Sequence, residues 1–267
     1  MMDKKIRTFM AAVLLVLTAC GARNNTLQEE AAGPQVEFHS HNDYAQAEPF
    51  YGAFRAGAGS IEADVFLVDS TVMLGHDSPT DHSIREGYLE PIRKAFLEND
   101  GSVYPDGRSF QLVVDLKDGV PALKALQKLI EEEYMPCFDV RNNPGAARLV
   151  ITGNAVKPDE YHLYPDFVFF DTRPGVEFTD EQLERVAMVS DYFGNYSKWK
   201  GRDTLGIQDR EVLRQVIEDA HARGKKIRFW AFPDNPLAWQ TTIDLGIDFI
   251  NTDHPAKVAE YLGQKEK

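Results

Sequence analysis

The sequence contains little cysteine: Cys20 and Cys137 are the two thiols among 267 residues. Cys20 belongs to the N-terminal segment described below, which leaves Cys137 alone in the rest of the chain. One thiol cannot form an internal disulfide, so a small disulfide-stabilised fold is excluded and stability must come from a core. With 43% hydrophobic residues, the sequence is typical of a globular protein.

Positive charge is also scarce: the sequence has 29 Lys and Arg residues against 42 Asp and Glu residues, which gives a net charge of −13. This balance argues against nucleic acid as a partner and against electrostatic adhesion to anionic lipid. It does not exclude a phosphate-bearing substrate, because a bound metal and nearby Lys or Arg side chains set the field inside a site. Beyond the first twenty residues no apolar run has transmembrane length, so we expect a soluble domain.

The N-terminus has the features of a targeting segment. Basic residues precede a short apolar run, Phe9–Leu17, and Leu17–Cys20 matches a bacterial lipobox. We therefore expect residues 1–19 to be a signal peptide and residues 20–35 to be a flexible tether beginning at a lipidated Cys20. This predicts a lipoprotein of the bacterial envelope, periplasmic or at the cell surface, that contacts the membrane through this anchor alone. An ordinary secretory signal and an uncleaved anchor are the alternatives.

Residues 36–267 alternate between short β-rich runs and helical patterns. Strands are predicted at Val36–His39, Ser60–Phe66, Val72–Leu74, Phe110–Leu116, Leu149–Gly153, Phe167–Asp171, Val186–Ser190, Ile227–Phe232 and Phe249–Asn251. Helices are predicted at Pro49–Ala56, Glu90–Leu97, Pro121–Glu133, Glu181–Glu184, Asp209–Arg223, Pro236–Leu245 and Pro255–Leu262. Eight parallel strands with intervening helices, plus a hairpin at Val72–Leu74, predict a single-domain α/β fold, the (β/α)8 TIM barrel.

A doubly wound open sheet is the alternative, but no Gly-rich phosphate fingerprint follows the first strand. Polar residues favour the barrel, because they fall at or just beyond the carboxyl ends of predicted strands, where barrel enzymes place their chemistry. These residues are His41, Asp64, Asp115, Asp171, Asp191, Trp230 and Asp253.

Three acidic residues form a candidate metal site. Glu62 and Asp64 are two positions apart on a strand and therefore point the same way. Asp115, a lone acid at the end of the next buried run, supplies a third carboxylate. Neighbouring carboxylates cannot all stay ionised without a cation, so a hard divalent metal is the simplest interpretation; solvated or lysine-paired acids are the alternative.

His41 and His76 lie beside these acids in the predicted layout. Histidine titrates near neutral pH, so two of them can act as general base and general acid. The alternative for each is a hydrogen-bonded structural histidine. For His39 a supporting and a structural role are equally plausible.

Further candidates would bind the substrate. Lys117 follows Asp115 by two residues and could neutralise a phosphate oxygen or form a plain salt bridge. Trp230 could wall the pocket or belong to the core, and Asn251 and Asp253 follow on the last strand.

Together these motifs resemble a known superfamily. The order is His41, then Gly-x-x-Ser-Ile-Glu-x-Asp-Val over 57–65, then His76, then Val-Val-Asp-Leu-Lys over 113–117. It is similar to the phosphatidylinositol-specific phospholipase C-like phosphodiesterase superfamily, which includes glycerophosphodiester phosphodiesterases and sphingomyelinase D enzymes. Residues 229–232 and 246–255 resemble the last two strands of that barrel.

The resemblance implies a metal-dependent phosphoric diester hydrolase. Its two catalytic histidines match His41 and His76, and its ligands of one Mg²⁺, sometimes Ca²⁺, match Glu62, Asp64 and Asp115. Lys117 and Trp230 match active-site positions of the sphingomyelinase D branch. The chain departs from the glycerophosphodiesterase pattern at Asn42-Asp43 and lacks the cysteine-bridged loop of the venom enzymes.

The substrate is therefore expected to be a small-molecule or lipid phosphodiester, without a defined head group, acted on by a monomer. We favour His41 for the nucleophile and His76 for the leaving group, although the sequence does not fix that order, and both hydrolysis and cyclisation remain open. A non-catalytic protein that binds a phosphorylated ligand or glycan is one rival. An amidohydrolase-like metallohydrolase using His39 and His41 is another, although its middle strands would lack the usual histidines.

Overall fold

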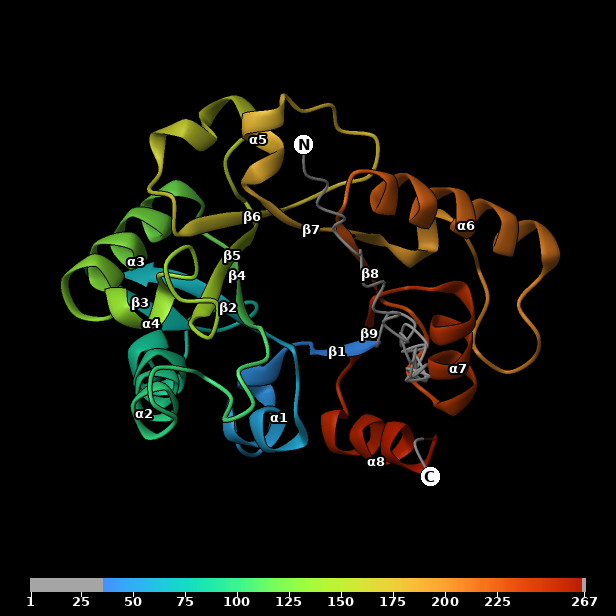
Figure 1. Cartoon of the computed structure of the whole chain (residues 1–267), viewed down its shortest axis with the longest axis horizontal. Coiled ribbons are helices and arrows are strands. Elements are labelled where there is room, and N and C mark those ends of the chain that lie inside the picture. The colour runs from blue at the N-terminus through green and yellow to red at the C-terminus, as the bar shows by residue number, and fades with distance from the viewer. Residues whose placement is uncertain (1–35, 266–267) are drawn as a thin grey trace, which may run out of the picture. The chain divides into compact units, whose positions relative to one another are not determined.

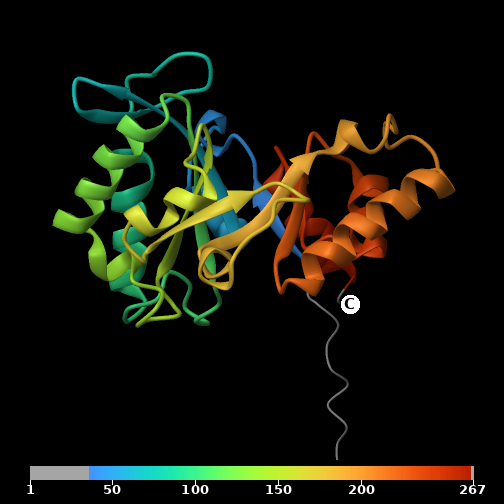
Figure 2. The same ribbon diagram turned by 90° about the horizontal axis from the view of Figure 1, so that it is seen from above.

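The structure is a computed structural model that describes residues 36–265. Eight parallel strands form a closed barrel. Figures 1 and 2 show the helices around it in two views. The strands follow the order β1-β9-β8-β7-β6-β5-β4-β2, and a β1–β2 pairing closes the ring. β3 pairs antiparallel with β2 as the predicted hairpin. The predicted TIM barrel is thus confirmed.

The strands span β1 Glu37–Ser40, β2 Ser60–Val68, β3 Thr71–Leu74, β4 Phe110–Leu116, β5 Ala147–Gly153, β6 Val168–Thr172, β7 Val186–Tyr192, β8 Lys226–Trp230 and β9 Phe249–Thr252. The α-helices span α1 Tyr51–Ala56, α2 Glu90–Glu98, α3 Val120–Glu133, α4 Met135–Phe138, α5 Asp180–Glu184, α6 Ile207–Ala222, α7 Pro236–Leu245 and α8 Pro255–Lys265. Short 3₁₀ segments lie at Asp43–Ala45, Pro158–Leu163 and Phe193–Asn195, and a π-helical turn lies at Arg85–Leu89.

The central strands are apolar on both faces, as parallel strands covered by helices must be. β4 illustrates this: every one of its residues except Asp115 is buried. The covering helices are amphipathic. In α3, the residues at helical spacing that point inward are Ala122, Leu123, Leu126 and Ile130.

Helix boundaries follow the local sequence. The Asn235 side chain accepts a hydrogen bond from the amide of Ala238 and so caps α7, and Pro236 occupies its first turn. Gly246, with φ of 77°, ends the same helix in the left-handed conformation.

The strand register places the predicted site residues at one level of the barrel. Asp64 pairs with Asp115 across β2 and β4, and His39 pairs with Ser60 across β1 and β2. The register between β8 and β9 rests on one pair, Arg228 with Phe249. The carboxyl ends of the strands, with their acids and histidines, therefore converge at one mouth.

The predicted elements are all present with small differences at their ends, whereas α4 and the π turn at Arg85–Leu89 were not predicted. Cys137 is a buried free thiol. Within the described range, no helix has the length and apolar character needed to cross a membrane. The predicted signal peptide, lipidated Cys20 and tether lie outside the described residues.

Candidate active site

A cavity of about 450 Å³ opens at the carboxyl ends of the strands. It is lined by eight of the predicted site residues, namely His41, Glu62, Asp64, His76, Asp115, Trp230, Asn251 and Asp253. Residues from six strands and the loops that follow them therefore reach one hollow, as the barrel predicts.

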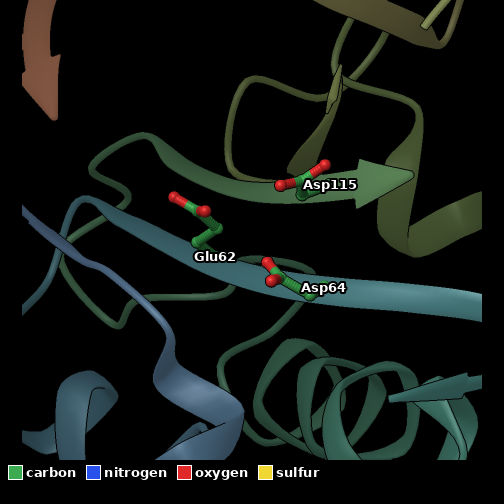
Figure 3. Close-up of side chains that lie close together, drawn as sticks. All are labelled: Glu62, Asp64 and Asp115. Atoms are coloured by element: carbon green, nitrogen blue, oxygen red, sulfur yellow. The ribbon is translucent and has the colours of Figure 1, made fainter. Parts of the chain in front are cut away.

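The three predicted carboxylates meet at the edge of this cavity. Glu62 and Asp64 project from β2 and Asp115 from the neighbouring β4, and the three side chains lie close together (Figure 3). Each offers an oxygen within 4.8 Å of the others' oxygens. Asp64 Oδ1 is buried and has no hydrogen-bond partner among the described residues. This donor set of hard oxygens, one of them unsatisfied, fits a divalent cation.

Lys117 lies against the carboxylates rather than free in the mouth. Its Nζ is 2.7 Å from Asp115 Oδ2 and 2.8 Å from Asp64 Oδ2. Burial alone would lower the pKa of Lys117, but these two carboxylates outweigh it and raise the pKa. The ammonium therefore stays charged and offsets part of the acidic cluster.

Burial raises the pKa of Asp115, helped by the neighbouring charges of Asp64 and Glu62 and opposed by Lys117. A positive ion at the cluster would remove this penalty, because an opposite charge favours the ionised carboxylate.

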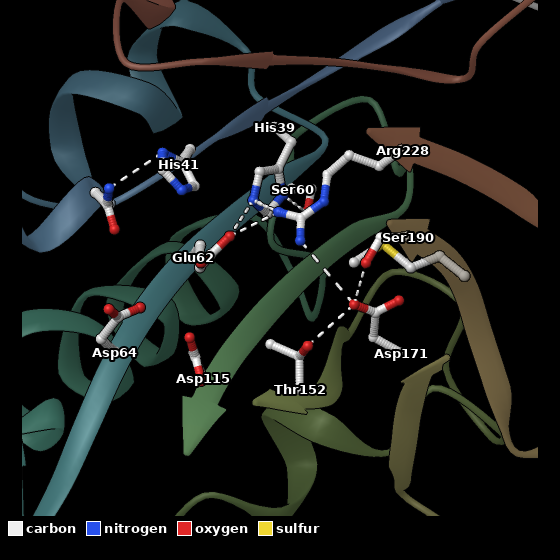
Figure 4. Close-up of polar contacts among 12 residues, drawn as sticks. His39, His41, Ser60, Glu62, Asp64, Asp115, Thr152, Asp171, Ser190 and Arg228 are labelled. Atoms are coloured by element: carbon white, nitrogen blue, oxygen red, sulfur yellow. Dashed lines mark hydrogen bonds and ion pairs between the residues drawn. The ribbon is translucent and has the colours of Figure 1, made fainter. Parts of the chain in front are cut away.

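Glu62 is fixed by two buried partners (Figure 4). His39 Nε2 and Arg228 Nη1 each lie 2.6 Å from Glu62 Oε2. Burial would raise the pKa of Glu62, but the charge of Arg228 and the hydrogen bond from His39 bring it well below its ordinary range. Glu62 is thus an ionised carboxylate with a fixed orientation.

His39 supports this arrangement. It is fully buried, and its Nδ1 lies 2.7 Å from Ser60 Oγ. Burial, together with Arg228, lowers its pKa to about 3, so the ring is neutral. Because both ring nitrogens contact protein groups, His39 is placed to orient Glu62, and it is poorly placed to be the metal ligand of an amidohydrolase.

The two predicted catalytic histidines share one feature: the Nδ1 of each faces a carboxylate. His41 Nδ1 is 2.8 Å from Asp253 Oδ1, and His76 Nδ1 is 2.7 Å from Asp64 Oδ2. Within residues 36–265 neither Nε2 has a hydrogen-bond partner, and that of His76 is 4.0 Å from an oxygen of Asp77. A carboxylate on Nδ1 fixes the ring and its tautomer, as in acid–base catalysis.

His41 and Asp253 also shift each other's titration. Burial would lower the pKa of His41, but the hydrogen bond to Asp253 outweighs it and raises the pKa. The same hydrogen bond lowers the pKa of Asp253. The pair therefore favours a protonated imidazole.

Trp230 on β8 and Asn251 on β9 also line the cavity. The Trp230 ring packs against Tyr192 at a centroid distance of 4.7 Å, and Asn251 Oδ1 is buried without a hydrogen-bond partner in the described part of the chain. Ala231, which follows Trp230 and lines the cavity, has φ of 56°, a strained value for a residue with a Cβ.

Another buried carboxylate, Asp171 on β6, does not line the cavity but contacts Thr152, which does. Asp171 accepts a 3.0 Å hydrogen bond from Thr152 and a second one from Ser190, and Arg228 Nη2 is 4.0 Å away (Figure 4). Arg228 therefore links the acid of β2 to the acid of β6 across the barrel. Asp191 is likewise not among the residues that line the cavity.

Sequence reasoning missed Arg228 and Tyr44. Arg228 could have been noticed as a charged residue inside the apolar run Ile227–Trp230. Tyr44, whose hydroxyl donates to Asp64 Oδ2 over 3.0 Å, carries no such signal.

Known proteins resemble this chain. Residues 31–163 match the family model of the AIM6-like phosphodiesterase domain. Altered inheritance of mitochondria protein 6 of Eremothecium gossypii is 26% identical over 95% of this chain and 78% of that protein. A homologue of that protein in Arthroderma benhamiae is 27% identical over 82% of this chain and 81% of its own length.

Solved structures are similar to this one. A Ca²⁺-dependent phosphatidylinositol-specific phospholipase C from Streptomyces antibioticus superposes with a TM-score of 0.52 at 12% identity, over 85% of this chain and 95% of that one. A glycerophosphodiester phosphodiesterase from Parabacteroides distasonis gives a TM-score of 0.49 at 15% identity, over 87% of this chain and 98% of that one.

The predicted bacterial envelope location is wrong. The relatives are fungal proteins, which conflicts with a bacterial lipid-anchored lipoprotein. The prediction depended on a leader of about twenty residues, and a short basic and apolar leader does not by itself identify a bacterial host. The domain match, in contrast, confirms the family resemblance of the motifs.

Proposed function

We propose that this member of the phosphatidylinositol-specific phospholipase C-like phosphodiesterase superfamily is a metal-dependent phosphoric diester hydrolase. The observation that carries the proposal is the pairing of each of two histidines, His41 and His76, with a carboxylate beside a cluster of three acids. A protein that only binds its ligand has no need for two imidazoles braced in this way.

Glu62, Asp64 and Asp115 would hold the cation, with Mg²⁺ as the first candidate and Ca²⁺ as the second. When bound, the cation would supply positive charge to the non-bridging phosphate oxygens and to the charge that develops on them. Arg228 and His39 keep Glu62 ionised and oriented for this role. Asp64 Oδ1, which has no hydrogen-bond partner in the described part of the chain, is available as a ligand atom.

The histidines would move protons. One Nε2 would accept the proton of the attacking hydroxyl, from water or from an alcohol of the substrate itself, and the other would donate a proton to the leaving alcohol. The raised pKa of His41 suits the donor role, which is the reverse of the order that the sequence favoured.

Lys117, beside the cavity, and Trp230 and Asn251, which line it, would bind the diester. Lys117 is charged and near enough to Asp64 and Asp115 to contact a phosphate at the same place. Trp230 offers an apolar face, and Asn251 an amide whose Oδ1 has no partner in the described residues. A cavity of about 450 Å³ accommodates a glycerol phosphodiester or the polar end of a lipid.

The test is turnover by the full chain of glycerophosphodiesters, lysophospholipids, sphingomyelin and bis-p-nitrophenyl phosphate, each with Mg²⁺, Ca²⁺ or chelator. We expect metal-dependent release of a phosphate monoester or a cyclic phosphate. His41→Ala and His76→Ala should each reduce turnover by at least ~10². His221→Ala is the matched control, because His221 also pairs with a carboxylate, Asp248, but lies outside the cavity.

Metal binding without turnover of any diester would contradict the hydrolase and favour a binding protein. Two tightly bound zinc ions per chain would instead favour an amidohydrolase-like enzyme. Near-normal turnover in either histidine variant would remove that residue from the mechanism.

A further inference from the structure

The opposite end of the barrel holds a second polar hollow, which the proposed reaction does not use. Its volume is about 290 Å³, and its lining includes the first residues of β1, β4, β7, β8 and β9. Because the catalytic residues lie at the carboxyl ends of the strands, this hollow is on the other face of the barrel.

Three cations reach this hollow: Arg148 from β5, Lys225 from the turn before β8, and Lys226 at the start of β8. Two carboxylates, Glu37 and Glu184, also line it. Glu37 is already paired with Lys226. In a protein with a net charge of −13, this is a local excess of positive charge.

Arg148 is the least compensated of these cations. It has no salt bridge within residues 36–265, and its Nε is buried without a hydrogen-bond partner. Its guanidinium carbon lies over the Phe169 ring, 5.1 Å from the ring centre. A buried N–H without a partner is costly unless a ligand or water accepts from it.

Lys225 also lacks a negatively charged hydrogen-bond partner within residues 36–265. Its Nζ donates 2.9 Å to the backbone oxygen of Val186, a neutral acceptor. Burial lowers the pKa of Lys225, and the charge of Arg148 lowers it further, against a weaker effect of Glu184. Burial likewise lowers the pKa of Arg148, with Glu37 as the opposing charge. An anion between the two cations would relieve both.

We propose that this hollow binds a small phosphate-bearing anion, with Arg148 and Lys225 as its ligands. A guanidinium presents several N–H donors in a fork that matches phosphate oxygens, and an ammonium adds a second charge. Within residues 36–265 neither cation is hydrogen-bonded to a carboxylate, and two such cations match a dianion better than a carboxylate. The volume fits inorganic phosphate or a small phosphate monoester and excludes a whole lipid. This inference does not depend on the proposed reaction.

The test is calorimetric titration of the full chain with inorganic phosphate and, separately, with glycerol 3-phosphate, in chelator and against chloride at equal ionic strength. We expect saturable binding that Arg148→Gln and Lys225→Gln each weaken by about tenfold or more. Lys128→Gln is the matched control, since Lys128 is a largely exposed cation on α3 and its loss should leave binding unchanged. Tighter binding of glycerol 3-phosphate would identify a monoester as the ligand, and equal binding would identify phosphate itself.

The proposal is overturned if the wild-type chain binds neither anion, or if both glutamine variants bind as the wild type does. In the second case the anion occupies the catalytic mouth. Circular dichroism shows whether each variant is folded, and Lys225→Gln tests the site even if Arg148→Gln unfolds, because Lys225 lies in a turn. Diester turnover is measured separately, so failure of the hydrolase and failure of this site are distinguishable.

Discussion

At the scale of single residues, the contact between His41 and Asp253 has a consequence for titration. Asp253→Asn removes the carboxylate that raises the pKa of His41, so that pKa should fall. Since a raised pKa keeps a histidine protonated to higher pH, the variant should lose its imidazolium at lower pH than the wild type. Titration of the His41 ring protons by NMR measures this shift, and an unchanged pKa would mean that Asp253 does not control the protonation of His41.

The same pair affects stability, with a sign that can be worked out. The raised pKa of His41 contributes stability that is complete below the unfolded value of 6.5 and is lost as pH rises through the folded pKa. The lowered pKa of Asp253 contributes stability that is lost as pH falls through its folded pKa. Because Asp253 is mostly exposed, both contributions are small.

Gly153 is a second single position with a testable role. It has φ of 75°, and an added Cβ would come within 1.7 Å of Asp115 Oδ1. Gly153→Ala should therefore displace the Asp115 carboxylate and weaken divalent-cation binding at least ~10-fold, of the order found for losing a group that orients a ligand. The measurement is calorimetric titration with Mg²⁺ or Ca²⁺.

Gly175→Ala is its matched control. Gly175 has φ of 77°, but nothing lies within 4 Å of the added Cβ. Both substitutions carry the same backbone strain, so equal metal affinity in the two variants would contradict the role given to Gly153.

At the scale of elements, Arg228 connects β8 with β2 and β6 through the buried carboxylates Glu62 and Asp171, and with β1 through His39. Arg228→Gln leaves Glu62 and Asp171 buried without their cation, and should lower the free energy of unfolding by about 3–5 kcal/mol. Urea unfolding followed by circular dichroism measures the change. Arg173→Gln is the control, because Arg173 lies 3.9 Å from the same Asp171 but is half-exposed. A loss no larger than that of the control would show that the link does not stabilise the barrel.

The elements themselves could be predicted from the sequence because each depends on local pattern. A β-branched run such as Val113–Val114 indicates a buried strand, and a proline in a first turn such as Pro236 indicates where a helix begins. The π turn at Arg85–Leu89 has no such local signal.

The links of the site depend on closure of the barrel and could be predicted only in part. Strand periodicity predicts that Glu62 and Asp64 point the same way, and the position of Asp115 at the end of the next strand predicts that it joins them. The contact of Arg228 with Glu62 joins residues 166 positions apart, which no local pattern reveals. The sequence could place Lys117 near the mouth of the barrel. Whether its ammonium contacts a phosphate or two carboxylates depends on its side-chain conformation, which the sequence does not determine.

At the scale of the whole molecule, the acidic cluster should couple metal binding to stability. An ion that binds the folded chain alone, at 100 times its Kd, adds about 2.7 kcal/mol, which for a domain of this size is a rise in Tm of roughly 5–10 °C. Thermal unfolding with Mg²⁺, Ca²⁺ and chelator measures it. Asp115→Asn should abolish most of the rise, and an equal rise in that variant would place the ion elsewhere.

The closing of the ring by its first and last strands also affects how the protein is made. During synthesis, Glu62 and its neighbouring acids leave the ribosome long before Arg228, because β8 and β9 come at the end of the chain. Until those strands pair with β1, the nascent half-barrel has open edges and an acid without its cation, and such intermediates aggregate readily. The growing chain therefore exposes these edges to aggregation until β8 and β9 have emerged and paired.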